Sequence, residues 1–242
     1  MRASDVRRAA LTRPTGVRHA MCAAWLLAGG AAHAQFGGGI AVETDNRFRG
    51  VSLTDGQPDL RLSLSYDHDS GVFAGAAATQ VEFMRGRRAL QLLGYAGYVA
   101  RVTPELGAEV GVTSSTFRGD TRYDYSEIFA GLSNERGSLR AYYAPRYFGF
   151  DQATAYLEFG ANTLLTPRLR AFGHVGVLRT LGGIEGEGGR RTRADLRVGL
   201  GFSAAAAVDV QLAWVTATRG GPYVVEYGAR RSSFVLGAQA SF

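Results

Sequence analysis

Apolar and polar residues alternate along most of this chain, in stretches of about 8–11 residues. The clearest stretch spans residues 193–202, and its apolar members are Ala194, Leu196, Val198, Leu200 and Phe202. A period of two residues is the signature of a β-strand, and this length suits a tilted strand that crosses a bilayer. After residue 34 the chain has no helical periodicity and no run of about 18 apolar residues, so the pattern predicts an all-β fold without a transmembrane helix.

Twelve alternating segments follow one another. They are expected at 36–45, 58–67, 71–82, 89–102, 105–116, 123–133, 138–147, 152–164, 168–179, 192–204, 207–217 and 232–242. Every second connection is short, whereas those at 46–57, 83–88, 117–122, 148–151, 181–191 and 218–231 tend to be longer and rich in Gly and Arg. An even number of strands with short turns at one end is typical of bacterial outer-membrane barrels. We predict one antiparallel up-and-down transmembrane β-barrel over residues 35–242; the alternative is a soluble secreted β-protein.

The first 34 residues have a different character. Their basic residues are Arg2, Arg7, Arg8, Arg13 and Arg18. The mostly apolar stretch 20–32 follows, and it is too short to span a bilayer as a helix. Ala32 and Ala34 then supply the small side chains that a signal peptidase reads. We therefore predict a cleaved signal peptide over residues 1–34 and export to the outer membrane.

Removal of this segment changes the composition. It leaves 242 − 34 = 208 residues and takes away the only cysteine, Cys22. The net charge falls from +6 to (27 − 5) − (21 − 1) = +2, because five arginines and one aspartate leave. The high pI of the full chain is therefore no argument for nucleic-acid binding. The chain has no lysine, which excludes a P-loop lysine or a Schiff-base lysine.

The last segment ends on an aromatic residue with a free carboxylate. Phe234, Leu236, Ala238, Ala240 and Phe242 share one face of this segment. A terminal Phe preceded by apolar residues at alternate positions resembles the signal by which outer-membrane barrels are recognised. We expect Phe242 to engage the barrel assembly machinery.

Charged residues within the strands define the inner face. An Arg that faces lipid near the bilayer midplane costs about 2–4 kcal/mol, so we expect the charged face to point into the lumen. The predicted pore-lining residues are Arg61, Arg101, Glu109, Glu127, Arg140, Glu158, Arg170, His174, Arg193, Asp195 and Arg197. The interior is then expected to be wet and to carry both signs of charge.

Sites of chemistry are sparse. His174 and Asn162 are expected on adjacent strands, but a lipid-acting Ser-His-Asn site would need them on the lipid side, and no serine pairs with His174. Glu127 and Glu158 could form a carboxylate pair, although Arg140 and Arg170 flank them, which favours charge neutralisation. No Cys/His cluster suggests a metal. We expect no catalytic residue, no metal and no cofactor.

Several segments resemble one known family. RFRGVSLTDGQP (47–58), AGAAATQVEF (74–83), YDYSEIFAGL (123–132) and YYAPRYFGF (142–150) are similar, in order, to segments of the TorF-type porins, a bacterial family whose substrate is not settled. The chain departs from the family pattern at Asn46 and Ala77, where we expect Tyr and Trp. The resemblance implies an outer-membrane barrel and, by name, a pore. The matching loop motif consists of Phe48, Arg49, Gly50, Ser52, Gly56 and Pro58, and turn formation explains it better than ligand binding.

The longer connections hold most of the excess positive charge. Their arginines are Arg47, Arg49, Arg85, Arg87, Arg88, Arg118, Arg122, Arg190, Arg191, Arg219, Arg230 and Arg231. A basic mouth would attract anionic solutes, but contact with the phosphates of lipopolysaccharide explains it equally well. Our functional prediction is a porin-like channel, monomeric or weakly oligomeric, for passive diffusion of small polar solutes, with anionic solutes as one alternative. The alternatives are a plugged structural or adhesive barrel and, less favoured, a lipid-acting barrel enzyme.

Overall fold

The computed structural model describes residues 35–84, 86–182, 190–223 and 230–242. The predicted signal peptide lies outside these residues. Within them, no helix is long and apolar enough to cross a membrane.

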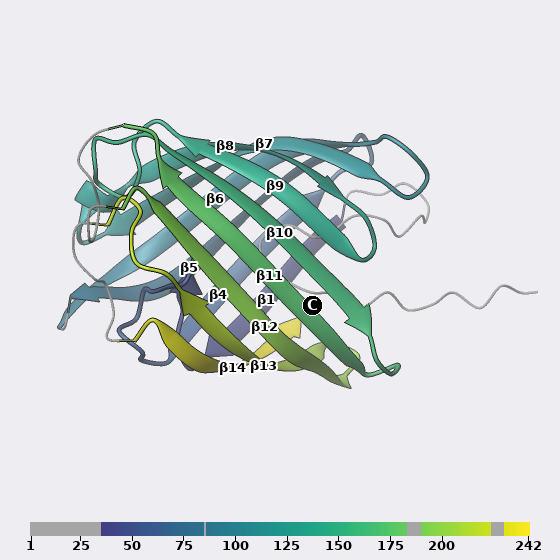
Figure 1. Cartoon of the computed structure of the whole chain (residues 1–242). Coiled ribbons are helices and arrows are strands. Elements are labelled where there is room, and N and C mark those ends of the chain that lie inside the picture. The colour runs from purple at the N-terminus through teal and green to yellow at the C-terminus, as the bar shows by residue number, and fades with distance from the viewer. Residues whose placement is uncertain (1–34, 85, 183–189, 224–229) are drawn as a thin grey trace, which may run out of the picture. The chain divides into compact units, whose positions relative to one another are not determined.

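Twelve antiparallel strands form a closed barrel (Figure 1). The strands are β1 (Gln35–Glu43), β4 (Asp59–Asp67), β5 (Val72–Met84), β6 (Arg87–Arg101), β7 (Gly107–Arg118), β8 (Tyr125–Ser133), β9 (Gly137–Ala144), β10 (Thr154–Leu164), β11 (Leu169–Thr180), β12 (Thr192–Ala205), β13 (Val208–Ala217) and β14 (Ser232–Ser241). Each pairs with its neighbours in sequence, apart from β1, which pairs with β4 and β14. The predicted all-β fold and each of the twelve predicted strands are confirmed.

The two ends of the barrel differ in their connections. Tight turns join β4 to β5, β6 to β7, β8 to β9, β10 to β11 and β12 to β13, and we call this end the short-turn end. Most connections at the other end, the long-loop end, are longer, and the one between β7 and β8 contains the 3-10 turn η1 (Thr121–Tyr123). The connection predicted at 83–88 is shorter than expected, because β5 continues to Met84 and β6 begins at Arg87. Charged residues suggested a loop there, but a strand that extends beyond the bilayer can carry them at little cost.

The outer face of the barrel is apolar. Each of the twelve strands exposes at least one large apolar side chain, among them Leu62 (49% exposed), Val112 (52%), Leu157 (51%), Leu212 (51%) and Leu236 (50%). Their neighbours in sequence point inward, as the buried Glu109, Arg193 and Arg197 do. Exposure of so many aliphatic side chains suits a hydrocarbon environment and confirms the predicted assignment of the two faces.

The first and last strands close the barrel. The register aligns Gly39 with Ser241 and Glu43 with Gly237. Beyond this ladder, the Phe242 amide donates to the Gly38 carbonyl (3.0 Å), and the Gly38 amide donates to the Phe242 carbonyl (2.8 Å). The Phe242 ring lies directly on Gly38, where an added Cβ would be 2.4 Å from a ring carbon.

Deletion of Phe242 is expected to lower the amount of protein assembled in the outer membrane. The deletion removes the proposed assembly signal and both hydrogen bonds to Gly38. The measurement is the fraction of protein in outer-membrane preparations that migrates differently before and after boiling. Phe242→Tyr keeps the ring and is the control. An unchanged fraction in the deletion would show that other features of β14 suffice for assembly.

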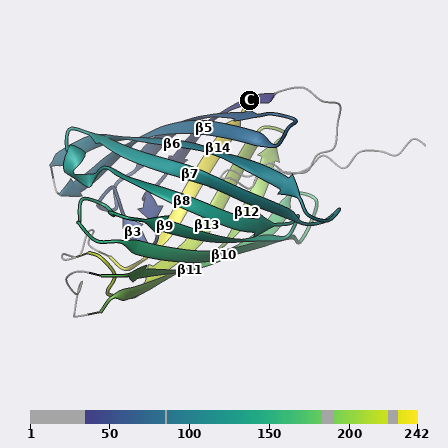
Figure 2. The ribbon, with the colours of Figure 1, turned by 90° about the horizontal axis from the view of Figure 1, so that it is seen from above.

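A further short hairpin does not belong to the wall. Strands β2 (Arg47–Phe48) and β3 (Val51–Ser52) pair only with each other in the described part of the chain. They lie in the connection between β1 and β4, which folds into the barrel (Figure 2).

Candidate functional site

Residues 45–54, here called the inner hairpin, are packed inside the barrel. Asp45, Asn46, Arg49, Val51 and Leu53 are each at most 6% exposed. The segment contains the first part of the loop motif that the sequence singled out. The interpretation of this motif as turn chemistry alone was therefore incomplete, because its side chains also fill the lumen.

The tip of the inner hairpin is a two-residue turn. Arg47 pairs with Ser52 and Phe48 with Val51, which leaves Arg49 and Gly50 as the central residues. Both have positive φ, +49° and +75°, as a type I′ hairpin turn requires. A residue with a side chain is uncommon in this region, and such strain costs on the order of 1–3 kcal/mol. The surroundings of Arg49 must offset that cost.

The Arg49 side chain enters a site made by the barrel wall. Its Nη1 and Nη2 donate to Oε1 and Oε2 of Glu127, on β8, at 2.9 and 2.8 Å. The guanidinium carbon lies 4.1 Å from the ring centre of Tyr156, 5.2 Å from that of Tyr142 and 5.3 Å from that of Tyr147. We call Glu127, Tyr142, Tyr147 and Tyr156 the Arg49 cage. It combines a bidentate carboxylate with three cation–π contacts.

Electrostatics keep this arginine charged. Burial lowers the pKa of the Arg49 guanidinium, but the Glu127 carboxylate raises it, and the net result is a pKa well above its ordinary value. The two side chains form an ion pair at 2.8 Å, and each is about 4% exposed.

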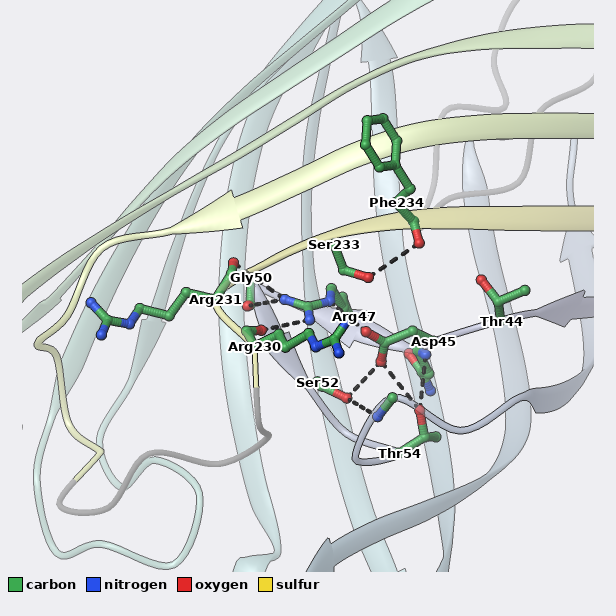
Figure 3. Close-up of polar contacts among 12 residues, drawn as sticks. Thr44, Asp45, Arg47, Gly50, Ser52, Thr54, Arg230, Arg231, Ser233 and Phe234 are labelled. Atoms are coloured by element: carbon green, nitrogen blue, oxygen red, sulfur yellow. Dashed lines mark hydrogen bonds and ion pairs between the residues drawn. The ribbon is translucent and has the colours of Figure 1, made fainter.

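Arg47 fixes the base of the inner hairpin (Figure 3). Its Nε donates to Oδ2 of Asp45 at 2.6 Å, and its Nη2 donates to the carbonyl of Arg230 at 2.6 Å. Asp45 Oδ1 also accepts a hydrogen bond from Ser52 Oγ at 2.5 Å. The first long loop is thereby tied to the start of the last strand, β14, across the seam of the barrel.

Asn46 and Leu53 add contacts to the wall. Asn46 donates to Asp59 at 3.0 Å and accepts from Arg61 at 3.2 Å, both on β4. The Leu53 carbonyl accepts from the Glu82 amide, on β5, at 2.6 Å. The inner hairpin is therefore held on several sides.

Aromatic side chains pack around the inner hairpin at the long-loop end. This aromatic cap consists of Phe117, Tyr125, Tyr147, Phe148 and Tyr223, each at most 7% exposed. Tyr125 and Tyr147 have ring centres 4.9 Å apart, and the hydroxyls of Tyr147 and Tyr223 are 3.0 Å apart. Burial raises the pKa of the Tyr147 and Tyr223 hydroxyls, so both stay neutral. The cap and the inner hairpin pack against each other at this end of the lumen.

The predicted pore-lining residues all occupy inward positions, but the structure divides them into two groups. The first group is buried and comprises Glu109, Glu127, Arg140, Arg193, Asp195 and Arg197. Within it Arg140 is paired with Glu109, and Arg197 donates to Glu43 at 3.3 Å. These residues hold the wall together rather than line open space.

The second group is more accessible. Arg61, Glu158, Arg170 and His174 are half-buried, and Arg101 is exposed at the end of β6. Glu158 accepts from the Tyr142 hydroxyl at 3.1 Å. The Arg170 guanidinium lies 5.1 Å from the ring centre of Phe172 and covers Gly201. These side chains form a charged inner wall that water can reach.

His174 belongs to a polar cluster on this wall. Its Nε2 is 3.0 Å from both the Tyr156 hydroxyl and Asp195 Oδ1. Tyr156 also donates to Asp195 Oδ2 at 3.1 Å. The cluster is inside the barrel, on the side away from lipid, and Asn162 is placed further along β10 beside Phe172. The described residues contain no group of three potential metal-binding side chains.

The loop arginines do not all belong to the mouth. Arg47 and Arg49 point into the barrel and are paired there, which corrects their assignment to a basic rim. Arg88, Arg118, Arg122, Arg190, Arg219 and Arg230 are exposed. Arg88 and Arg122 pair with Glu82 and Asp120, so part of the remaining charge is compensated. Arg85 lies outside the described residues.

Comparison with known proteins shows the family. Residues 27–240 match the profile of Gcw_chp, described as a bacterial protein of unknown function. The chain belongs to the Gcw_chp family. No curated protein matches the chain.

Solved structures share the barrel. The chain is similar to the KdgM porin, with a TM-score of 0.54, 11% identity, and coverage of 85% of this chain and 99% of that one. It is also similar to the NanC porin, with a TM-score of 0.60, 7% identity and the same two coverages. At these identities the likeness is one of fold, and it confirms the closed β-barrel architecture.

The sequence carries one signal for the inner hairpin in addition to its turn residues. Phe48, Val51 and Leu53 are apolar residues inside a connection that is otherwise polar. A loop that carries several apolar side chains must bury them, and in a barrel of this size the lumen is the available place.

Proposed function

We propose that the protein is a porin-like channel of the bacterial outer membrane for passive diffusion of small polar solutes. The observation that carries the proposal is the charged, half-buried part of the inner wall, where Glu158, Arg170 and His174 are accessible to water. A barrel sealed throughout would need each of these charges to be paired at a high desolvation cost. The apolar outer belt, the fold shared with the KdgM and NanC porins, and the resemblance to TorF-type porins support the location.

The size of the barrel is compatible with a regulated passage. Eight strands leave an interior that side chains fill, whereas sixteen or more leave an aqueous channel. Twelve strands lie between these limits. The inner hairpin occupies part of the space, and its central turn is only two residues long. Displacement of this segment would widen the lumen without unfolding the wall.

A second candidate is a structural barrel without transport. The nearly complete burial of the aromatic cap and the ion pair in the Arg49 cage favour it, because both close the long-loop end. Measurement of conductance distinguishes the two candidates.

Purified protein in planar bilayers is expected to give small conductance steps whose ion selectivity depends on Glu158 and Arg170. Glu158→Gln removes a negative charge from the passage and should shift the reversal potential toward anion preference. Arg170→Gln should shift it in the opposite direction. These half-buried residues are chosen because a change at Arg140 would leave the buried Glu109 without its partner.

Glu135→Gln provides the control, because Glu135 is exposed in the turn after β8 and outside the lumen. It should leave the reversal potential unchanged. A wild type that stays silent while an inner-hairpin variant conducts would favour the closed structural barrel. Silence in all variants would contradict the channel. The sign of the wild-type reversal potential tests whether the solutes are anionic, as the basic mouth suggested.

A further inference from the structure

The Arg49 cage is chemically complementary to a guanidinium group, whichever molecule carries it. Glu127 offers two oxygens to the two terminal nitrogens of the guanidinium, at 2.8 and 2.9 Å. The rings of Tyr142, Tyr147 and Tyr156 lie within 5.3 Å of the guanidinium carbon. A bidentate carboxylate combined with aromatic faces suits a planar, delocalised cation. The four cage residues come from the wall and the β9–β10 loop, so the site exists apart from the inner hairpin.

The backbone at Arg49 supports the interpretation that its side chain acts as an internal ligand. The first central position of a type I′ turn favours Asn, Asp or Gly. Here Arg occupies that position at a φ of +49°, followed by Gly50 at +75°. A turn that served only to reverse the chain would not require Arg. The residue is explained by what its side chain reaches, which is the cage.

The cage has one accessible side. Glu127, Tyr147 and Tyr156 are at most 4% exposed, but Tyr142 is half-buried. The Tyr142 hydroxyl donates to Glu158 on the accessible part of the inner wall. A solute in the lumen would therefore meet Glu158 and Tyr142 before it reached Glu127.

We propose that the cage is a binding site for the guanidinium group of a small solute, and that Arg49 fills this site when the solute is absent. This proposal depends on the proposed channel in one respect, which is that the solute reaches the cage through the lumen. Arg49 is tethered, and tethering gives a competing group an effective concentration in the millimolar range. Free ligand must therefore compete with Arg49 in the wild type, and binding frees the tip of the inner hairpin.

The test is calorimetric binding of methylguanidinium chloride to the detergent-solubilised barrel carrying Arg49→Asn. Asn followed by Gly50 is the preferred type I′ pair, so the hairpin keeps its form while the guanidinium is removed. Arg49→Asn is expected to bind methylguanidinium at least about tenfold more tightly than the wild type, because the tethered competitor is gone. A titration with sodium chloride at the same concentration is the reference for effects of ionic strength and chloride.

Arg49→Asn/Glu127→Gln is the matched control. It keeps the shape of the cage but removes its charge, so binding should be lost. Arg49→Gly, which also tolerates positive φ, replaces Arg49→Asn if the latter does not fold. A folded Arg49→Asn or Arg49→Gly barrel that binds methylguanidinium no better than the double variant overturns the proposal. Calorimetry is independent of the conductance experiment, so the two proposals can fail separately. Binding of methylguanidinium by a barrel that does not conduct would refute the channel and support the cage as a binding site. Conductance without binding would refute only the binding site.

Discussion

Glu127→Ala is expected to drive the inner hairpin out of its buried position. The change leaves the Arg49 guanidinium without its carboxylate, and breaking a buried ion pair by removal of one partner costs about 3–5 kcal/mol. Both side chains are about 4% exposed, so water cannot replace the lost oxygens while the hairpin stays in place. The cost is avoided if Arg49 moves into solvent. Two measurements report this movement: larger conductance steps, and cleavage by trypsin after Arg47 or Arg49 in whole cells.

A double-mutant cycle separates this effect from general damage. Arg49→Asn, Glu127→Ala and the double variant are compared by urea unfolding in lipid. The double variant should be less destabilised than the sum of the single changes, because neither charge is then left alone. Arg88→Asn is the control, since the Arg88 side chain is 72% exposed and an ion pair at the surface contributes about 0–1 kcal/mol. If the losses in free energy of unfolding are additive and trypsin resistance is unchanged, the Arg49–Glu127 pair does not hold the inner hairpin in place.

The wall of the barrel was predictable because lipid imposes a strict rule on it. Residues such as Leu212 and Leu236 must face hydrocarbon, so their neighbours must face the lumen, and the register follows from the sequence. The same rule fails at the ends of strands. Glu82 and Arg88 are paired in β5 and β6, and a strand end that extends beyond the hydrocarbon can carry such charges at little cost. These charged residues are the reason why the sequence predicts a longer loop at this place.

The partners within the lumen could not be predicted in the same way. Alternation tells which side of the wall Glu127 faces, but not that Arg49, 78 residues away, reaches it. The pairing depends on the depth to which the inner hairpin folds into the barrel. Positive φ at Arg49 and Gly50 shapes its tip, and Gly in a loop is usually a sign of turn formation alone. The motif was thus recognised as a turn, whereas its packing depends on contacts with β8 and β10.

Asn46 illustrates how a departure from a family pattern acquires a physical meaning. The resemblance to TorF-type porins leads us to expect Tyr at this position. The structure instead buries the Asn46 amide between Asp59 and Arg61 of β4, with 1% exposure. An amide can both donate to the carboxylate and accept from the guanidinium, whereas a phenol at the same place would have to displace one of them. At the base of the inner hairpin, the asparagine therefore suits the Asp59 and Arg61 side chains that this chain has on β4.

Leu212→Arg is expected to prevent stable assembly, whereas Gln211→Arg, one residue earlier, should be tolerated. Leu212 is 51% exposed in the middle of β13 on the lipid side, and an Arg near the bilayer midplane costs about 2–4 kcal/mol. Gln211 points inward, where its amide donates to Glu43 at 3.3 Å, and an Arg there could pair with the same carboxylate. The measurement is the fraction of heat-modifiable protein in outer-membrane preparations, followed by urea unfolding in lipid. Equal losses in the two variants would contradict the assignment of faces on β13, because only a difference between lipid and lumen makes neighbouring positions so unequal.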